Sequence, residues 1–147
     1  MLRFRQIRQS DADPQKWQNT ALAALLGGEQ YPAERLAAGS TVIVMYDADV
    51  PAGLIAVSAK TVGEKPRCGV VEHVVLLPQY RRHGFGRILM GMAANLIAER
   101  QIWFAAGAVP EDETAQKFAA AIGFRAAGQP EGMWVLDLSD VEGLRYG

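Results

Sequence analysis

Apolar and polar residues alternate in short blocks along the chain, and the spacing changes repeatedly between strand-like and helix-like. Alternating apolar and polar residues predict a first strand over residues 2–8. Asp13 and Pro14 are typical of a helix start, with an N-cap residue followed by proline at the first helical position. Apolar residues then recur at helical spacing until Gly27 ends the pattern: Trp17, Ala21, Leu22, Leu25 and Leu26. A second short helix is expected over 33–38.

The middle of the chain is rich in β-type patterns. Strands are predicted over 41–46 and 53–58, joined by a turn over 47–51. A loop is expected over 61–67, because glycine and proline interrupt the pattern there. A continuous apolar run then predicts a central buried strand over 68–77.

The second half alternates in the same way. A helix is predicted over 84–99, and its expected inner face has spacings of three and four: Phe85, Ile88, Leu89, Met92 and Leu96. Further strands are predicted over 102–109, 123–127 and 133–138, with a helix that starts near 110 and ends at Gly123. This order predicts an α/β (α+β) fold with a central mixed sheet and helices on both faces.

Composition agrees with one folded domain over residues 1–147. Half of the 147 residues are hydrophobic and 21% are charged, so the chain can bury a core. The 15 basic and 16 acidic residues give a net charge of -1, which disfavours a general nucleic-acid binder. Cys68 is the one cysteine, which excludes an intrachain disulfide and favours a reducing compartment. Without a signal-peptide core or an apolar run of membrane-spanning length, a cytoplasmic location and no membrane partner are expected.

The segment 77–87 carries the main functional signal. A strand leads into a basic, glycine-containing turn, and a helix follows it. Unpaired N–H groups and the peptide dipoles favour an anion at such a helix start. Gly84 and Gly86 let the backbone approach a ligand, and Arg81, Arg82 and Arg87 supply positive charge suited to phosphate. The alternative is an ordinary strand-to-helix turn that happens to be basic.

Two common phosphate motifs do not fit this turn. The dinucleotide fingerprint requires a third glycine where Leu89 stands, and no acidic residue follows at the ribose-binding distance. The nucleotide P-loop requires lysine after its glycine, which is absent. The pattern that remains is R-x-x-G-x-G, with Pro78 three residues before its arginine.

This longer pattern, E-x-x-x-L-x-P-x-Y-R-x-x-G-x-G from Glu72 to Gly86, resembles the GCN5-related N-acetyltransferase (GNAT) family. The order of elements is also similar, with a mostly antiparallel sheet, and Gly123-Phe124 resemble the end of the family's second signature. The resemblance implies that one domain binds acetyl-coenzyme A (acetyl-CoA) as co-substrate. The implied pyrophosphate site is the segment of Arg81, Arg82, His83, Gly84, Phe85, Gly86 and Arg87. The pantetheine arm would pair with the backbone of Val74, Val75 and Leu76.

Glu72 is the candidate catalytic residue. A carboxylate within an apolar strand is costly unless it is paired, partly hydrated or functional. Acyl transfer needs a neutral amine, and a carboxylate can take the proton directly or through water. The resemblance implies N-acetyl transfer to a primary amine by direct attack, with Glu72 as base. A structural salt bridge is the alternative for Glu72, and His73 on the opposite face is expected to be a packing or surface residue.

Ala119 departs from the family pattern. The resemblance places a tyrosine there that protonates the departing thiolate, and Asp112 replaces an expected asparagine. The competing hypothesis is therefore a non-catalytic acyl-CoA-binding regulatory domain. The acceptor, a small amine or a protein N-terminus, is not specified by the sequence, and a homodimer is left open. No metal site is expected, because His73 and His83 lie on different elements without metal-ligand spacing.

Overall fold

A computed structural model describes residues 1–62, 65–99, 104–108, 125–126 and 133–137, together with residues 113, 116–117 and 120. Side chains are described for residues 1–59, 68–96 and the four separate positions. The chain forms two compact units, Met1–Val57 with His73–Leu89, and Ser58–Glu72 with Met90–Gly147. Strands β3 (Val50–Val62) and β4 (Lys65–Leu76) and helix α4 (Phe85–Glu99) each contribute to both units, so the chain passes three times between them.

In the first unit the strands are hydrogen-bonded in the order β1-β2-β3-β4. Strand β1 covers Leu2–Gln6 and β2 covers Thr41–Asp47, and both β1–β2 and β2–β3 are antiparallel. The strands predicted at these places are confirmed, although β1 ends at Gln6 and β2 continues to Asp47. The loop predicted over 61–67 is too long, because β3 extends to Val62 and β4 already begins at Lys65.

A β-bulge interrupts the pairing of β2 with β3. Met45 lies opposite Gly53 and Tyr46 lies opposite Pro51, so Ala52 is an extra residue on β3. The carbonyl of Ala52 accepts a hydrogen bond of 2.9 Å from the N–H of Leu77. The bulge therefore holds the residue that follows the end of β4.

Three short α-helices and one 3-10 helix connect β1 with β2: η1 (Gln9–Ala12), α1 (Pro14–Trp17), α2 (Ala21–Leu26) and α3 (Tyr31–Ala37). The predicted cap is confirmed, since the Asp13 side chain accepts a hydrogen bond from the N–H of Gln15. The continuous helical stripe from Trp17 to Leu26 is wrong. Asn19 has a positive φ of 63°, and the helix starts again after it.

Thr20 caps this second start. Its hydroxyl accepts a hydrogen bond of 3.2 Å from the N–H of Ala23 and donates one of 2.7 Å to the carbonyl of Trp17. The new start rotates the helix face, which leaves Leu25 43% exposed while Leu22 and Leu26 are buried. Gly27, with φ 90°, ends α2 as predicted.

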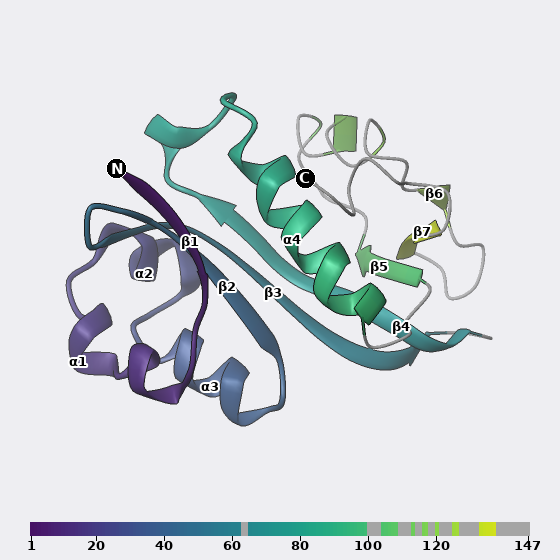
Figure 1. The fold of residues 1–147 in the computed structure, drawn as a ribbon, viewed down its shortest axis with the longest axis horizontal. Helices are drawn as coiled ribbons and strands as arrows, with labels where there is room; N and C mark the ends of the chain where they lie inside the picture. The colour runs from purple at the N-terminus through teal and green to yellow at the C-terminus, as the bar shows by residue number, and fades with distance from the viewer. Residues whose placement is uncertain are drawn as a thin grey trace. The chain divides into compact units, whose positions relative to one another are not determined.

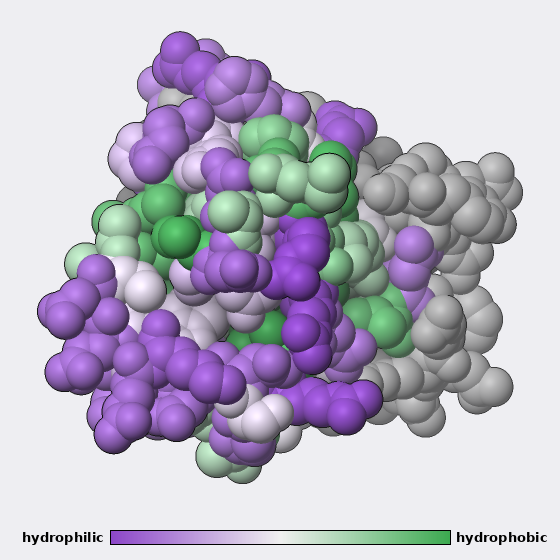
Figure 2. All heavy atoms as spheres, turned by 60° about the vertical axis from the view of Figure 1, so that its left-hand side comes forward, coloured by the Kyte–Doolittle hydropathy of each residue, from purple (hydrophilic) through white to green (hydrophobic). Residues whose placement is uncertain are grey.

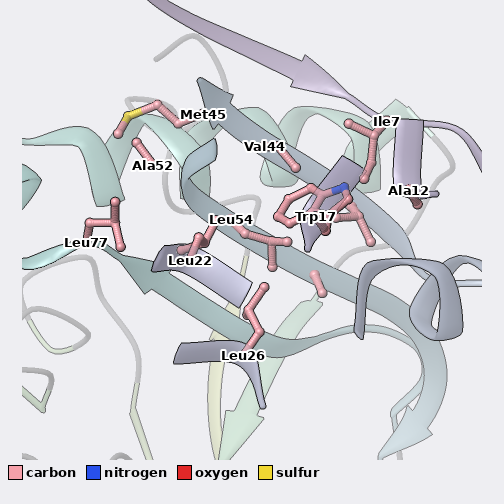
Figure 3. Packing of buried hydrophobic residues seen from close by; sticks show 12 residues of the cluster. Ile7, Ala12, Trp17, Leu22, Leu26, Val44, Met45, Ala52, Leu54 and Leu77 are labelled. Atoms are coloured by element: carbon pink, nitrogen blue, oxygen red, sulfur yellow. The ribbon is translucent and has the colours of Figure 1, made fainter. Parts of the chain in front are cut away.

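The core of the first unit lies between these helices and the strands (Figure 3). Trp17 and Leu22 pack with Val44 and Leu54, and all four are at most 1% exposed. The indole N–H of Trp17 donates a 2.9 Å hydrogen bond to the carbonyl of Asp11, so its polar end is satisfied. Ile43, on the opposite face of β2, is also fully buried. Burial of both faces of β2 is the signature of a sheet covered on both sides.

Helix α4 (Phe85–Glu99) follows β4 and the 3-10 turn η2 (Pro78–Tyr80), and it confirms the helix predicted over 84–99. Its most buried side chains are only partly those expected. Leu89 is buried as predicted, whereas Phe85, Ile88, Met92 and Leu96 are half-buried. Three residues outside the predicted inner face are buried together with Leu89: Met90, Ala93 and Ala94.

In the second unit the strand order is β3-β4-β5-β7-β6. Strand β5 (Phe104–Ala108) runs parallel to β4, while β6 (Arg125–Ala126) and β7 (Met133–Asp137) complete an antiparallel part. The sheet is therefore mixed and mostly antiparallel, and the predicted fold class is confirmed (Figure 1). Residues 113, 116–117 and 120 are helical, as predicted. Ala119 and Gly123 lie outside the described residues, and the assignment of 1–147 to one acyltransferase domain stays a prediction.

Hydrophilic side chains cover much of the described surface in Figure 2, and apolar side chains are visible between them in separate patches. Within the described part of the chain, the helices are too short or too polar to cross a membrane.

Candidate functional site

The candidate site is the turn between β4 and α4, which belongs entirely to the first unit. Leu77 is buried and directly follows β4. In η2 the N–H of Tyr80 donates to the carbonyl of Leu77 (2.9 Å), and the N–H of Arg81 donates to the carbonyl of Pro78 (3.2 Å). Helix α4 begins at Phe85. The predicted strand–turn–helix arrangement is confirmed.

Two residues of this turn have left-handed backbone conformations. Arg82 has φ 66° and Gly84 has φ 83°. Glycine adopts this conformation without strain, but a residue with a Cβ does so at a cost of about 1–2 kcal/mol. A Cβ built on Gly84 would meet no atom of the described residues within 4 Å. The backbone of Gly84 therefore faces open space, as a close-approach position requires.

The backbone N–H groups of this turn are available to a ligand. The carbonyl of Gly84 accepts the first helical hydrogen bond, 3.2 Å from the N–H of Ile88. In the described part of the chain, the N–H groups of residues 82–87 donate to no protein acceptor. Unpaired donors at the start of a 15-residue helix, reinforced by its dipole, form an anion-binding site.

The three arginines of the turn have different surroundings. The Nε of Arg81 donates a 3.1 Å hydrogen bond to the carbonyl of Leu76, which ties this side chain to the end of β4. Arg82 and Arg87 are exposed on either side of Gly84 in the sequence. His83 is also exposed, and its ring centroid lies 5.8 Å from that of Phe85. The sequence analysis gave all three arginines the same role. In the structure they differ, because the guanidinium groups of Arg82 and Arg87 have no hydrogen bond to the described residues, whereas that of Arg81 does.

Tyr80 connects the turn to the end of β2. Its hydroxyl donates a short hydrogen bond to a carboxylate oxygen of Asp47, and its ring lies 6.4 Å from that of Phe85. This hydrogen bond lowers the pKa of Asp47 and raises the pKa of Tyr80. The sequence gave no sign of this contact, because the partners are 33 residues apart and no local pattern joins them.

The residues expected beside the turn on β4 are placed directly before it. Val74, Val75 and Leu76 are half-buried, and Val75 and Leu76 pack against the core of the first unit. A Cβ on Gly53 of β3 would lie 2.5 Å from Cδ2 of Leu76 and 3.2 Å from the carbonyl oxygen of Val75. Glycine at position 53 therefore lets β3 approach this part of β4 closely.

Glu72 and His73 are neighbours on β4 and point to opposite faces. Glu72 is half-buried and shares a face with Val74 and Leu76, as the alternation predicted. His73 makes an edge-to-face contact with Tyr31, with ring centroids 5.3 Å apart. Burial lowers the pKa of His73 below its ordinary value of 6.5. The packing role expected for His73 agrees with this contact.

The pairing of β4 with β5 is short. Within the second unit, Cys68, Gly69 and Val70 pair with Phe104, Ala105 and Ala106. Among the described residues the register stops there, although β4 continues through Val71 and Glu72. Of the described side chains, no group of three or more histidine, cysteine, aspartate or glutamate residues could hold a metal ion.

Comparisons with known proteins agree on one family. The sequence profile of the acetyltransferase (GNAT) family matches residues 4–124. None of the curated proteins compared with the chain matches it by sequence.

Solved structures with a similar fold include the PaiA N-acetyltransferase from Thermoplasma acidophilum in complex with coenzyme A. It has a TM-score of 0.69 at 11% identity, over 92% of this chain and 96% of that chain. AtaT complexed with acetyl-methionyl-tRNAfMet has a TM-score of 0.75 at 14% identity, over 98% and 99%. An acetyltransferase of the GNAT family from Staphylococcus aureus has a TM-score of 0.69 at 13% identity, over 94% and 99%.

Proposed function

The chain belongs to the acetyltransferase (GNAT) family, and we propose on this premise that it transfers an acetyl group from acetyl-CoA to a primary amine by direct attack. One observation carries the proposal: the N–H groups of residues 82–87 at the start of α4 have no acceptor among the described residues, and they lie beside Gly84, whose α-carbon has none of those residues within 4 Å of an added Cβ. Such a site suits a pyrophosphate, which is the anionic centre of coenzyme A.

The cofactor contacts follow from this placement. The pyrophosphate oxygens would accept hydrogen bonds from the N–H groups of the turn, and Arg82 and Arg87 would add charge-assisted contacts. The pantetheine amides would pair with the backbone of Val74, Val75 and Leu76, in the manner of a ligand added to a strand edge. Complexes with coenzyme A among proteins of similar fold support this choice of ligand.

The chemistry requires a neutral amine and a route for its proton. Glu72 is the candidate base, because it is a half-buried carboxylate on the same face of β4 as Val74 and Leu76. The amine nitrogen attacks the thioester carbonyl, a strand N–H stabilises the oxyanion, and the C–S bond breaks to release the thiolate. An alkyl thiol has a pKa of about 8.5, so solvent can protonate the departing thiolate without a tyrosine at Ala119.

Thermal unfolding with acetyl-CoA tests the donor site. A ligand at a hundred times its Kd stabilises the native state by about 2.7 kcal/mol, which for a chain of this size raises Tm by roughly 5–10 °C. Gly84→Ala should lose most of this increase, because the added methyl group faces the ligand. Gly39→Ala is the matched control, since Gly39 has a similar φ of 93° and its Cβ would also meet nothing within 4 Å.

Both glycine variants should lose similar stability without ligand, because the backbone strain is of the same kind. An equal acetyl-CoA response in wild type, Gly84→Ala and Gly39→Ala would contradict the placement of the pyrophosphate.

A second candidate function is acyl-CoA binding without catalysis, and Ala119 in place of the family's tyrosine favours it. Release of free thiol from acetyl-CoA distinguishes the two candidates. The acceptor panel should contain small primary amines, peptides with free N-termini and an aminoacyl-tRNA, since one protein of similar fold is complexed with an acetylated one. Tight binding with no thiol release above hydrolysis for any acceptor would favour the binding module.

A further inference from the structure

The hydrogen bond between Tyr80 and Asp47 links the end of β2 to the turn between β4 and α4. We call this turn, residues 77–87, the donor turn, because the proposed function places acetyl-CoA there. We propose that this hydrogen-bonded pair positions the turn for the pyrophosphate, so that Tyr80 is a positioning residue for acetyl-CoA binding. The inference rests on the proposed function, and it concerns a contact whose second partner, Asp47, lies outside the pattern from Glu72 to Gly86. Asp47 is the last residue of β2, and Tyr80 is the last residue of η2.

The two ends of the Tyr80 side chain are held by different parts of the unit. Its hydroxyl donates to Oδ2 of Asp47, while Oδ1 of Asp47 lies 3.5 Å from the amino group of Met1. Its ring packs against the core and lies 6.4 Å from the ring of Phe85, the first residue of α4. Phe85 in turn lies 5.8 Å from the ring of His83. The pair therefore connects β2 to the start of α4.

The other hydrogen bonds at the start of this stretch are local: the two backbone bonds of η2 and the bond from Nε of Arg81 to the carbonyl of Leu76. Backbone hydrogen bonds hold both ends, from Leu77 to Ala52 before the turn and from Ile88 to Gly84 after it. Between them, the N–H groups of residues 82–87 have no protein acceptor in the described part of the chain. Arg82 is held in a left-handed conformation, which persists only where the surroundings enforce it.

A turn without the Tyr80 contact would spend part of its time in relaxed conformations. The N–H groups would then not converge on one point, and the apparent affinity for the ligand would fall by the fraction of molecules that remain competent. The affinity for a ligand that lacks the pyrophosphate would not change, because such a ligand does not bind the N–H groups of the turn. The proposal therefore predicts a loss that depends on which part of the cofactor is offered.

The test measures the Kd of acetyl-CoA by calorimetry and of S-acetylpantetheine by NMR titration. Tyr80→Phe keeps the ring and removes only the hydroxyl. It should weaken acetyl-CoA by about five- to tenfold and change S-acetylpantetheine by less than about twofold. Tyr46→Phe is the matched control, because it removes the hydroxyl of another half-buried tyrosine, next to Asp47, and should change neither.

Asp47 supplies the second variant. Asp47→Ala should weaken acetyl-CoA as much as Tyr80→Phe does, and combining the two changes should add nothing further. Asp47→Asn retains a carbonyl oxygen that can accept from Tyr80 and should recover most of the affinity.

Each contrary result has its own meaning. If wild type binds acetyl-CoA and Tyr80→Phe binds it equally well, the positioning role is wrong and the proposed function stands. Equal weakening of both ligands, or no recovery in Asp47→Asn, would also overturn the positioning role. If wild type does not bind acetyl-CoA at all, the proposed function and the inference both fail.

Discussion

Replacing Arg82 with glycine should raise the stability of the free protein and weaken its response to acetyl-CoA. Arg82 has φ 66°, a conformation that costs a residue with a Cβ about 1–2 kcal/mol. Glycine removes this strain, but it also makes the unfolded chain more flexible, which lowers the free energy of unfolding by about 0.4–1 kcal/mol. The balance is a gain of about 0.5–1 kcal/mol in the free energy of unfolding, or roughly 1–4 °C in Tm for a chain of this length.

Ala48 provides a control with the same backbone but no charge. It has φ 52° in the turn between β2 and β3, so Ala48→Gly should raise Tm by a similar amount. Only Arg82→Gly also removes a guanidinium from the donor turn. A lost charge-assisted contact to phosphate corresponds to about a tenfold weaker Kd. The acetyl-CoA-induced rise in Tm should therefore be smaller in Arg82→Gly and unchanged in Ala48→Gly.

The measurement is a pair of thermal unfolding curves for each protein, without ligand and across an acetyl-CoA titration. Equal ligand responses in Arg82→Gly and wild type would show that Arg82 does not contact the cofactor. A lower Tm in Arg82→Gly, with a higher Tm in Ala48→Gly, would show that the Arg82 side chain stabilises the fold itself.

Three further predictions concern β3 and β4. Gly53→Ala should lower the free energy of unfolding by about 1–3 kcal/mol, because its Cβ would lie 2.5 Å from Cδ2 of Leu76; an unchanged urea midpoint would contradict this close approach. Glu72→Gln should lower turnover and leave the Kd of acetyl-CoA nearly unchanged, with a smaller loss at higher pH where more of the amine is neutral; equal rates at every pH would leave Glu72 a structural residue. Since burial lowers the pKa of His73 below 6.5, its contribution to stability is present above pH 6.5 and is lost as the pH falls through the lowered value. His73→Gln should therefore flatten the decline in stability between pH 7 and pH 5, measured by urea unfolding, with His83→Gln as the exposed control.

The strand–turn–helix arrangement around residues 77–87 could be predicted because its signal is contiguous in the sequence. Strand, basic glycine turn and helix follow one another from Leu77 to α4, so local spacing was enough to place every candidate residue of the turn. The same is true of the alternating strand β1, of the apolar strand β2 and of the cap at Asp13. In each case the determining interactions lie within a few residues.

Features that depend on distant or conformational information were missed. Asn19 breaks the predicted helix because its backbone is left-handed, which residue type alone does not reveal. The Tyr80 to Asp47 contact joins residues far apart in the chain. The early end of the β4–β5 register at Val70 depends on how two strands meet, and a single sequence contains no record of that pairing. Tertiary context decides all three.

The extra residue at Ala52 has a consequence for how chains of this family can differ in length. Its carbonyl receives the N–H of Leu77, so the bulge sets where the donor turn begins. Deleting one residue of β3 near Ala52 would move every following side chain to the other face of the sheet. Deleting two would keep the faces but displace the anchoring carbonyl by roughly 7 Å. Insertions and deletions among related proteins should therefore be scarce from Met45 to Leu54 and collect instead in the helical connections, such as the one after Gly27.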